Sequence, residues 1–437
     1  MFKNELSSFL EEYVKQDSLR LFMPGHQGRC SFLNKNISPI YDITEIKGAD
    51  YLYNSLGVIK NLEDKISKLY FSDAYISASG STLCIFTILW LLRKRKFIAN
   101  RSAHISFYNA AALFSISPIF IGNTRTVSLA EIKKAILKAG FGSVLFITSP
   151  NYYGEVLDIA KIAKMCDKYN VILVVDGAHG SHLRFTKENL HPISLGAKFC
   201  IDSFHKTLPA LTGASVLHVN CNMFNRDIIK KSMAIFGSSS PSYLIMHSIG
   251  LCVDWLEEKA YKGFLKLQQR KEDLINSLNL VFLKTDPSKL VLDCFYVEGG
   301  FLKVVEILEE EKIEAEFYNK NFVCFILTPF LKSKDFKRLK KALRRLNFAE
   351  NKEKVFFNSF KFKRILSLNE AIFAEKEEVV LKEAIFKVAA EVIWSDVPGV
   401  PILTYGEMID FFAIKILKEK KIKSVVVVKD LKVKRGD

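Results

Sequence analysis

The chain has 437 residues, of which 49% are hydrophobic and 25% charged, and its formal net charge at pH 7 is +16. This length is sufficient for two or three domains with a large core. The apolar runs are shorter than the ~20 residues that cross a bilayer, and the first residues lack the basic and apolar regions of a signal peptide. We therefore expect a soluble, cytoplasmic protein with no membrane partner.

Cysteine usage and charge exclude further classes of protein. The eight cysteines form no CxxC pair, which indicates reduced thiols, and no His/Cys cluster has the spacing of metal ligands, so we expect no metal site. Basic residues are spread along the chain and are densest at Arg93–Lys96 and Lys332–Arg345. Because no recognised nucleic-acid module accompanies them, we interpret the charge as a solvated surface and expect no nucleic-acid partner.

The first part of the chain predicts a helix followed by an arm. Leu6, Phe9, Leu10 and Tyr13 recur at helical spacing within residues 1–20, which is typical of an amphipathic helix. A turn rich in Pro and Gly follows it. We expect residues 1–50 to form a helix and arm that pack on a partner subunit or on the body of the chain.

Strand and helix patterns alternate from residue 57 onward. β-branched, apolar runs predict strands at 73–77, 97–100, 117–121, 144–148 and 171–175, with helical segments between them. This alternation predicts an α/β fold with a mostly parallel sheet covered by helices. We assign residues 51–280 to this large domain, 281–360 to a smaller α/β domain and 361–437 to a helical appendage that ends in a strand-like run at 424–428. A long helix from Tyr243 to about Leu278 is expected to connect the two domains.

Polar residues gather where the predicted strands end, which is the edge at which such sheets bind ligands. Gly80, Ser81 and Thr82 open a helix and form either a phosphate cradle or simple helix capping. The other strand ends supply His104, the segment Ser149–Gly154, the segment Asp176–His179, and Ser203 with His205 and Lys206.

Lys206 follows the apolar run Phe199–Ile201, and Asp176 directly follows the apolar run 171–175. A lysine in this setting suits a Schiff base, because burial shifts its pKa readily. The order of these groups along the strand ends predicts pyridoxal 5′-phosphate (PLP) as cofactor. Its phosphate is expected on the helix at Ser81, its ring against His104, its ring nitrogen on Asp176 and its covalent bond at Lys206.

Several motifs resemble the PLP-dependent ornithine/lysine/arginine decarboxylase family of the aspartate aminotransferase fold. The resemblance runs from about Leu21 to Glu407, and its most specific parts are the run His205–Thr212 and the run Ser240–Tyr243. It implies that the cofactor is surrounded by Gly80, Ser81, Thr82, His104, Asp176, His179, Ser203, His205, Lys206 and Ser239. The loop from Ser239 to Tyr243 resembles one that reaches the neighbouring subunit, which implies a homodimer or larger homo-oligomer with a shared active site.

The sequence departs from this family at four places. Tyr51 stands where the family often has an acidic residue, Gly177 where it often has Glu, and Gly213 where it often has Gln. A frequent Pro-Gly-Glu is replaced by Tyr405-Gly406-Glu407. These departures leave the predicted catalytic core intact and bear on the substrate pocket.

The favoured hypothesis is decarboxylation of a basic amino acid to its amine in polyamine metabolism. Lys206 is displaced by the substrate amine, Asp176 holds the protonated ring nitrogen, and His205 or Lys206 returns a proton to Cα. Arginine is preferred over lysine and ornithine, because short members of the family resemble biosynthetic arginine decarboxylases. Two alternatives stay open: an aminotransferase or lyase on the same fold, and a catalytically lapsed basic binding protein.

Overall fold

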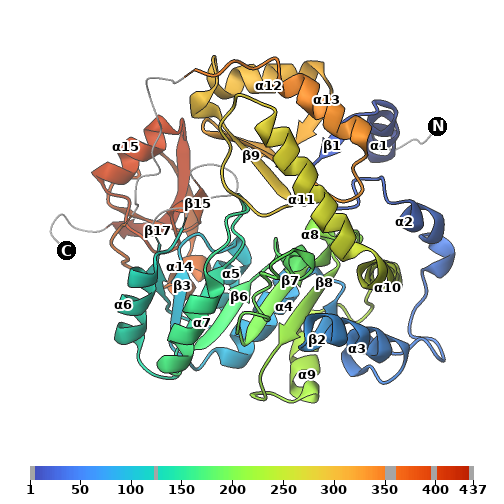
Figure 1. Ribbon diagram of the computed structural model, residues 1–437. Coiled ribbons are helices and arrows are strands. Elements are labelled where there is room, and N and C mark those ends of the chain that lie inside the picture. The colour runs from blue at the N-terminus through green and yellow to red at the C-terminus, as the bar shows by residue number, and fades with distance from the viewer. Residues whose placement is uncertain (1–4, 123–125, 350–360, 395–400, 433–437) are drawn as a thin grey trace.

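The computed structural model describes residues 5–122, 126–349, 361–394 and 401–432 (Figure 1). At its centre is a seven-stranded sheet of order β2-β8-β7-β6-β5-β3-β4. Its strands are β2 (Asp73–Ser77), β8 (Ser215–Val219), β7 (Phe199–Ser203), β6 (Ile172–Asp176), β5 (Val144–Thr148), β3 (Phe97–Asn100) and β4 (Ile119–Ile121). The five strands β7, β6, β5, β3 and β4 pair in parallel with one another in that order, whereas β8 is antiparallel to β7 and to β2. The predicted mostly parallel α/β sheet is confirmed.

Helices cover both faces of this sheet, so its central strands are buried throughout. Phe146 and Val174 face a core that includes α4 (Gly80–Leu92) and α5 (Ile105–Leu113). Their neighbours Leu145 and Leu173 face the core beneath α6 (Leu129–Ala139) and α7 (Ile159–Lys168). Successive residues of a strand point to opposite faces. This explains why continuous apolar runs, rather than alternating ones, identify these strands in the sequence.

The segment after the sheet forms two helices where one was expected. The structure places α10 at Tyr243–Glu258 and α11 at Ala260–Asn276, with Lys259 between them at φ −129°. That backbone angle lies outside the helical range, so the chain turns at Lys259 and each helix buries its own apolar face. Continuous helical periodicity in the sequence does not reveal such a turn.

A second group of elements follows α11. The strands β9 (Lys289–Asp293), β12 (Phe322–Ile326) and β11 (Phe317–Tyr318) form an antiparallel sheet beside α12 (Gly300–Glu310) and α13 (Ser333–Leu343). The N-terminal helix α1 (Glu5–Lys15) leads to β1 (Leu19–Leu21), which pairs in parallel with β10 (Ile313–Ala315). The arm therefore packs on the body of the chain itself. The boundaries expected at residues 50, 280 and 360 stay predictions.

The C-terminal segment lies beside the β3 end of the central sheet (Figure 1). It contains α14 (Leu368–Phe373) and α15 (Phe411–Glu419), together with a sheet of β13 (Lys376–Val380), β17 (Ser424–Lys432) and β14 (Lys387–Ala389). A two-stranded pair, β15 (Ile393–Trp394) and β16 (Pro401–Leu403), completes it. The strand-like run expected at 424–428 is confirmed as part of β17. The further strands of the segment were not expected, because β17 finds its partners 38–52 residues earlier in the chain.

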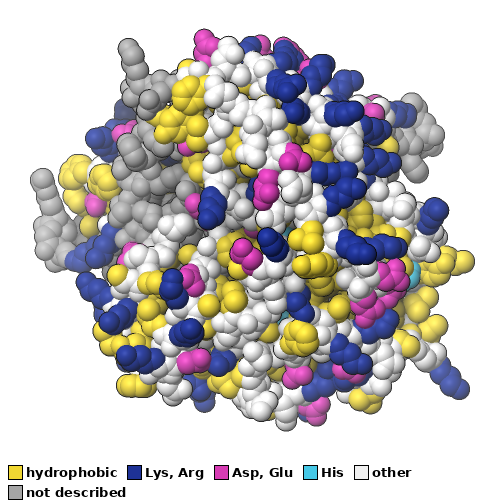
Figure 2. Space-filling view, in the orientation of Figure 1, with side chains coloured by type: hydrophobic (Ala, Val, Ile, Leu, Met, Phe, Trp, Pro, Cys, Tyr) yellow, Lys and Arg dark blue, Asp and Glu magenta, His cyan; other side chains and the backbone are white. Residues whose placement is uncertain are grey.

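Basic side chains are distributed over the visible face of the molecule, with a group around the position of α12 and α13 (Figure 2). Acidic and apolar side chains are interspersed among them. Within the described ranges, no helix has the length and apolar character needed to cross a membrane.

Candidate active site

A cavity of about 550 Å³ lies at the carboxyl ends of the central strands. Nine of the ten residues predicted to surround the cofactor line it: Gly80, Ser81, Thr82, His104, Asp176, His179, Ser203, His205 and Lys206. The tenth, Ser239, is exposed in the loop between α9 (Arg226–Phe236) and α10 and does not line the cavity of this chain. The strand order therefore brings together groups that are as far as 126 residues apart in sequence.

The start of α4 has the features of a phosphate cradle. Ser81 Oγ lies 2.7 Å from Ser203 Oγ and 2.8 Å from Ser215 Oγ, which gathers three hydroxyls beside the helix terminus. The N-cap residue is Ser79, and no side chain caps the helix. The simple capping alternative is therefore wrong. The unpaired N–H groups in the first turn of a helix and the positive end of its dipole favour an anion at this terminus.

Gly80 and Gly213 hold the backbone of this cradle in place. The Gly80 N–H donates to the Gly213 carbonyl over 2.8 Å. Both residues have positive φ angles, +71° and +98°, which glycine adopts without steric cost. The departure at Gly213 thus has a structural reason, because a side chain in this conformation is strained and would also lie 3.1 Å from Ile245.

Ser215 supports Ser81, and sequence reasoning missed it. It pairs with Ser203 in the antiparallel register of β7 and β8, so both hydroxyls lie on the same face of the sheet. Ser215 is fully buried, and its hydroxyl donates to the Asp202 carbonyl. The register that pairs it with Ser203 is a tertiary feature.

Lys206 lies in the short helix α8 (Phe204–Thr207), directly after β7. Its Nζ is 3.2 Å from Nε2 of His179. Burial lowers the pKa of Lys206, and the nearby charge of Lys289 lowers it further, whereas Asp176 acts in the opposite direction. The neutral amine, which is the nucleophilic form, is therefore more accessible than in an exposed lysine.

Asp176 ends β6, and only 2% of its surface is exposed. Burial raises the pKa of this carboxyl group, while the charges of Lys206 and His104 oppose the increase. The Ala178 N–H donates to Oδ1 over 3.2 Å and fixes one carboxylate oxygen. A carboxyl group with raised proton affinity is suited to share a proton with a buried ring nitrogen.

Three histidines line the cavity, and burial favours the neutral form of each. Burial lowers the pKa of His104, His179 and His205. His205 Nδ1 donates to the Ala214 carbonyl over 2.9 Å, and His104 Nδ1 accepts from the Ser106 N–H over 3.2 Å. Each ring is thereby held in a fixed orientation.

These residues fit PLP. His179 lines the cavity, and its Nε2 lies 3.2 Å from Lys206 Nζ. Ser81 and Ser203, which also line the cavity, offer hydroxyl groups for a phosphate. Asp176 and Lys206 offer the ring-nitrogen partner and the amine.

The far wall of the cavity contains residues that carried no functional signal in the sequence. Trp394, from β15 in the C-terminal segment, lines it together with Tyr152. The Tyr152 hydroxyl donates to Glu316 Oε1 over 2.6 Å, and its ring lies 4.9 Å from Nζ of Lys289. The second group of elements and the C-terminal segment therefore both help to shape the site.

The remaining departures lie behind the cavity or away from it. Tyr51 packs edge-on against Tyr53 and does not line the cavity of this chain. Glu407 is buried and binds Arg101, three residues before His104, with oxygen–nitrogen distances of 2.6 and 2.7 Å. Gly177 follows Asp176, and its side-chain space is filled by Cys200 and Asp202.

The fold and the site together define the class of PLP-dependent decarboxylases on a fold shared with other PLP enzymes. The sequence model of the Orn/Lys/Arg decarboxylase major domain matches residues 5–281. The chain therefore belongs to the Orn/Lys/Arg decarboxylase family.

Curated relatives agree with this assignment, and solved structures agree with the fold. The chain is 24% identical to the arginine decarboxylase of Bacillus subtilis over 92% of this chain and 90% of the relative. It is 29% identical to the uncharacterized protein YaaO of the same organism over 73% of this chain and 72% of that protein. Its fold is similar to the lysine decarboxylase LdcF of Francisella novicida, with a TM-score of 0.74, 16% identity, and coverage of 97% and 81% of the two chains. The constitutive lysine decarboxylase of E. coli gives a TM-score of 0.71 at 16% identity, with coverage of 96% and 79%.

Proposed function

We propose that the protein decarboxylates arginine to agmatine and carbon dioxide, as a step of polyamine metabolism in the cytoplasm. The observation that carries the reaction class is the convergence of Lys206, Asp176, His104 and the hydroxyl cradle on one cavity. The choice of arginine is supported by relatives named arginine decarboxylase that align with 92–93% of this chain. Lysine and ornithine are the competing substrates.

The roles of the residues follow from their positions. Lys206 supplies the covalent anchor for PLP, and Ser81 and Ser203 bind its phosphate with N–H groups in the first turn of α4, while Ser215 holds Ser81 in place. PLP supplies an electron sink for the carbanion left when carbon dioxide departs. Asp176 holds a proton at the ring nitrogen, and His104 packs against the ring. His205 or the amine of Lys206 returns a proton to Cα.

The distal cation of the substrate meets an aromatic wall. Among the described residues that line the cavity, Asp176 is the one carboxylate, and it is committed to the ring nitrogen. Trp394 and Tyr152 present π-systems, which attract a cation and stack well with a planar guanidinium. This supports arginine as the substrate.

A homodimer or larger homo-oligomer with a shared active site completes the proposal. Ile40, Ile46, Leu56 and Val58 are 56–83% exposed in and near the N-terminal arm, and a group of large exposed apolar side chains supports an interface there. The exposed loop at Ser239 is the segment proposed to reach the neighbouring cavity. Light scattering coupled to gel filtration measures the assembly directly, and a monomeric mass for the PLP-loaded protein contradicts this part of the proposal.

The deciding experiment supplies purified protein and PLP with arginine, lysine or ornithine in separate reactions and measures amine and carbon dioxide. Agmatine from arginine supports the proposal, and the Lys206→Ala variant serves as the inactive control. Cadaverine or putrescine as the main product reassigns the substrate and keeps the reaction class. Formation of a keto acid instead of an amine indicates an aminotransferase. Protein that binds PLP and converts none of the three substrates contradicts the proposed function.

A further inference from the structure

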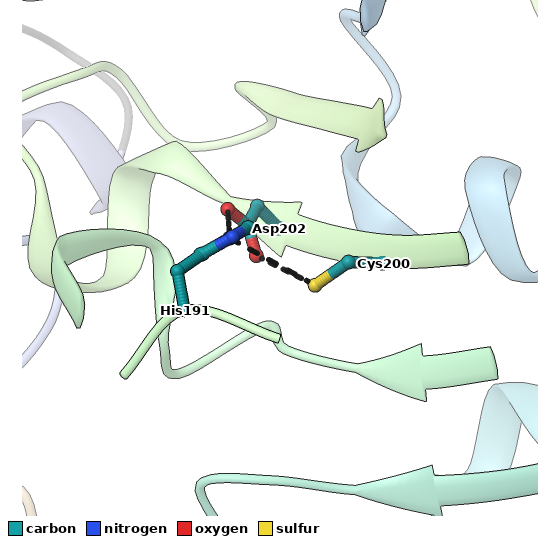
Figure 3. Close-up of side chains that lie close together, drawn as sticks. All are labelled: His191, Cys200 and Asp202. Atoms are coloured by element: carbon teal, nitrogen blue, oxygen red, sulfur yellow. Dashed lines mark hydrogen bonds and ion pairs between the residues drawn. The ribbon is translucent and has the colours of Figure 1, made fainter. Parts of the chain in front are cut away.

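The strand that leads to Lys206 carries a buried carboxylate on its far face. Ser203 of β7 points into the cavity, so the preceding residue, Asp202, points to the opposite side of the sheet. There Asp202 Oδ2 lies 2.9 Å from Nε2 of His191 and 3.3 Å from Nε2 of His218. Figure 3 shows His191, Cys200 and Asp202 directed toward one another. We refer to these residues, with His218, as the Asp202 cluster.

The Asp202 cluster is fully buried and carries charge. Burial by itself raises the pKa of Asp202, but His191 and His218 together hold it well below its usual range. The carboxylate is therefore ionised inside the protein. The ring of Tyr70 packs 4.9 Å from the ring of His191 and 4.5 Å from that of His218, which fixes both imidazoles. Burying a charge costs free energy, so we expect the Asp202 cluster to have a structural or functional role.

Gly177 connects the Asp202 cluster to the active site. A Cβ atom at Gly177 would lie 2.7 Å from Cys200 Sγ and 2.9 Å from Asp202 Oδ1. The φ angle of Gly177 is not in the left-handed region, so the requirement for glycine is one of space and not of backbone conformation. Cys200 and Asp202 thus occupy the volume behind Asp176 that a side chain at residue 177 otherwise fills.

A chain of contacts runs from the Asp202 cluster to the residue that follows Asp176. Cys200 Sγ donates to Asp202 Oδ1 over 3.4 Å. The same sulfur packs against Gly177, where it would lie 2.7 Å from a Cβ atom. On the other side of that segment, the Ala178 N–H holds Asp176 Oδ1.

We propose that the Asp202 cluster positions Asp176 through this chain of contacts. The ionised Asp202 orients the Cys200 thiol, and the thiol packs against Gly177 and so fixes the backbone that sets the direction of the Asp176 carboxylate. Asp202 and Cys200 are positioning residues that act through Asp176. The inference rests on the proposed function only for the role of Asp176 as partner of the ring nitrogen.

A metal site is the competing explanation of the same residues. The nitrogen, sulfur and oxygen of His191, Cys200 and Asp202 lie within 4.8 Å of one another, and this set of ligand types suits Zn²⁺. One observation favours hydrogen bonds instead. The 2.9 Å between His191 Nε2 and Asp202 Oδ2 is the length of a hydrogen bond.

The test compares Cys200→Ala, which breaks the chain but leaves Asp202 and its imidazoles intact, with Cys200→Ser, which retains a donor and acceptor. The matched control is Glu63→Gln, because Glu63 is an equally buried carboxylate that binds Lys230 and lies outside the active site. Three quantities are measured: the pH midpoint of the absorbance band of bound PLP, the dissociation constant of PLP, and kcat with KM. Metal content is determined on the purified wild-type protein.

We expect Cys200→Ala to shift the absorbance midpoint and to lower kcat by about tenfold to a hundredfold with little change in KM, because a small misplacement of a catalytic group has effects of that order. Cys200→Ser is expected to restore both, and Glu63→Gln to change neither. Asp202→Asn should behave like Cys200→Ala where it folds. The absorbance midpoint and the PLP dissociation constant need no substrate, so they test the inference even if the proposed substrate is wrong. Wild-type values for Cys200→Ala in all three measurements, or one equivalent of bound metal per chain that is lost in Cys200→Ala, overturns it.

Discussion

Arg101 and Glu407 join the loop after β3 to the C-terminal segment through two hydrogen bonds of 2.6 and 2.7 Å between buried side chains. Arg101 also donates to the Ile402 carbonyl over 2.9 Å. His104 lies three positions after Arg101 in the sequence, and Trp394 lies thirteen positions before Glu407. Both His104 and Trp394 line the cavity. The ion pair therefore holds two walls of the active site together.

Glu407→Gln is expected to destabilise the protein by about 3–5 kcal/mol, because it leaves the Arg101 guanidinium buried with its charge uncompensated. Urea unfolding followed by circular dichroism measures the change. Asp254→Asn, which removes the exposed partner of Lys65, is the control and should leave the unfolding midpoint unchanged. Equal midpoints for Glu407→Gln and the wild type contradict a structural role for the pair.

Lys206→Ala is expected to abolish amine formation, with a loss of at least about a thousandfold, because no other buried amine in the described part of the cavity replaces the covalent anchor. The absorbance band of covalently bound PLP should also disappear, while the circular dichroism spectrum stays that of the wild type. Product formation at the wild-type rate by this variant is incompatible with the assigned role of Lys206.

Ser81→Ala is expected to weaken PLP binding by about tenfold to a hundredfold, the effect of losing one hydrogen bond to a charged group. Equilibrium titration of the apoprotein, followed by tryptophan fluorescence, gives the dissociation constant. Ser232→Ala removes a hydroxyl that bonds within α9 and should leave PLP affinity unchanged. If Ser81→Ala binds PLP as tightly as the control, the phosphate lies elsewhere.

Trp394→Ala is expected to raise KM for the basic amino acid by about threefold to thirtyfold, since a desolvated cation–π contact contributes roughly 0.5–2 kcal/mol. PLP affinity should not change, because Trp394 belongs to the wall opposite the cradle. Trp394→Phe keeps an aromatic face and should give an intermediate KM. An unchanged KM for Trp394→Ala shows that the distal cation binds to other groups.

The lowered pKa of Lys271 is expected to increase the free energy of unfolding at alkaline pH. Burial lowers its pKa to about 8, against the attraction of Asp286, while its pKa in the unfolded chain is about 10.4. Between these values the unfolded chain binds the proton more tightly, so the free energy of unfolding increases with pH, by up to ~3 kcal/mol from this group. The difference in unfolding free energy between wild type and Lys271→Met, measured from pH 7.5 to 10.5, should grow accordingly. A difference that is constant over this range contradicts the lowered pKa.

Much of the fold and of the active site follows from the sequence alone. The runs 144–148 and 171–175 are apolar throughout, since both faces of a parallel sheet are buried, and Asp176 and Lys206 stand out because they interrupt or follow such runs. The carboxyl ends of parallel strands lie at one edge of a sheet, so local patterns suffice to place Gly80, His104, Asp176 and Lys206 around one site.

Tertiary structure decided what local patterns do not encode. Ser215 reaches the phosphate cradle through the antiparallel register of β7 and β8, and Trp394 reaches the cavity because Glu407 binds Arg101 across 306 residues. The sequence shows Gly177 only as a missing side chain, whereas the structure shows that Asp202 and Cys200 fill the space of that side chain. In each case the partner is chosen by packing between elements far apart in the chain. Sequence periodicity reports which face of an element is buried, and it contains no information on what that face meets.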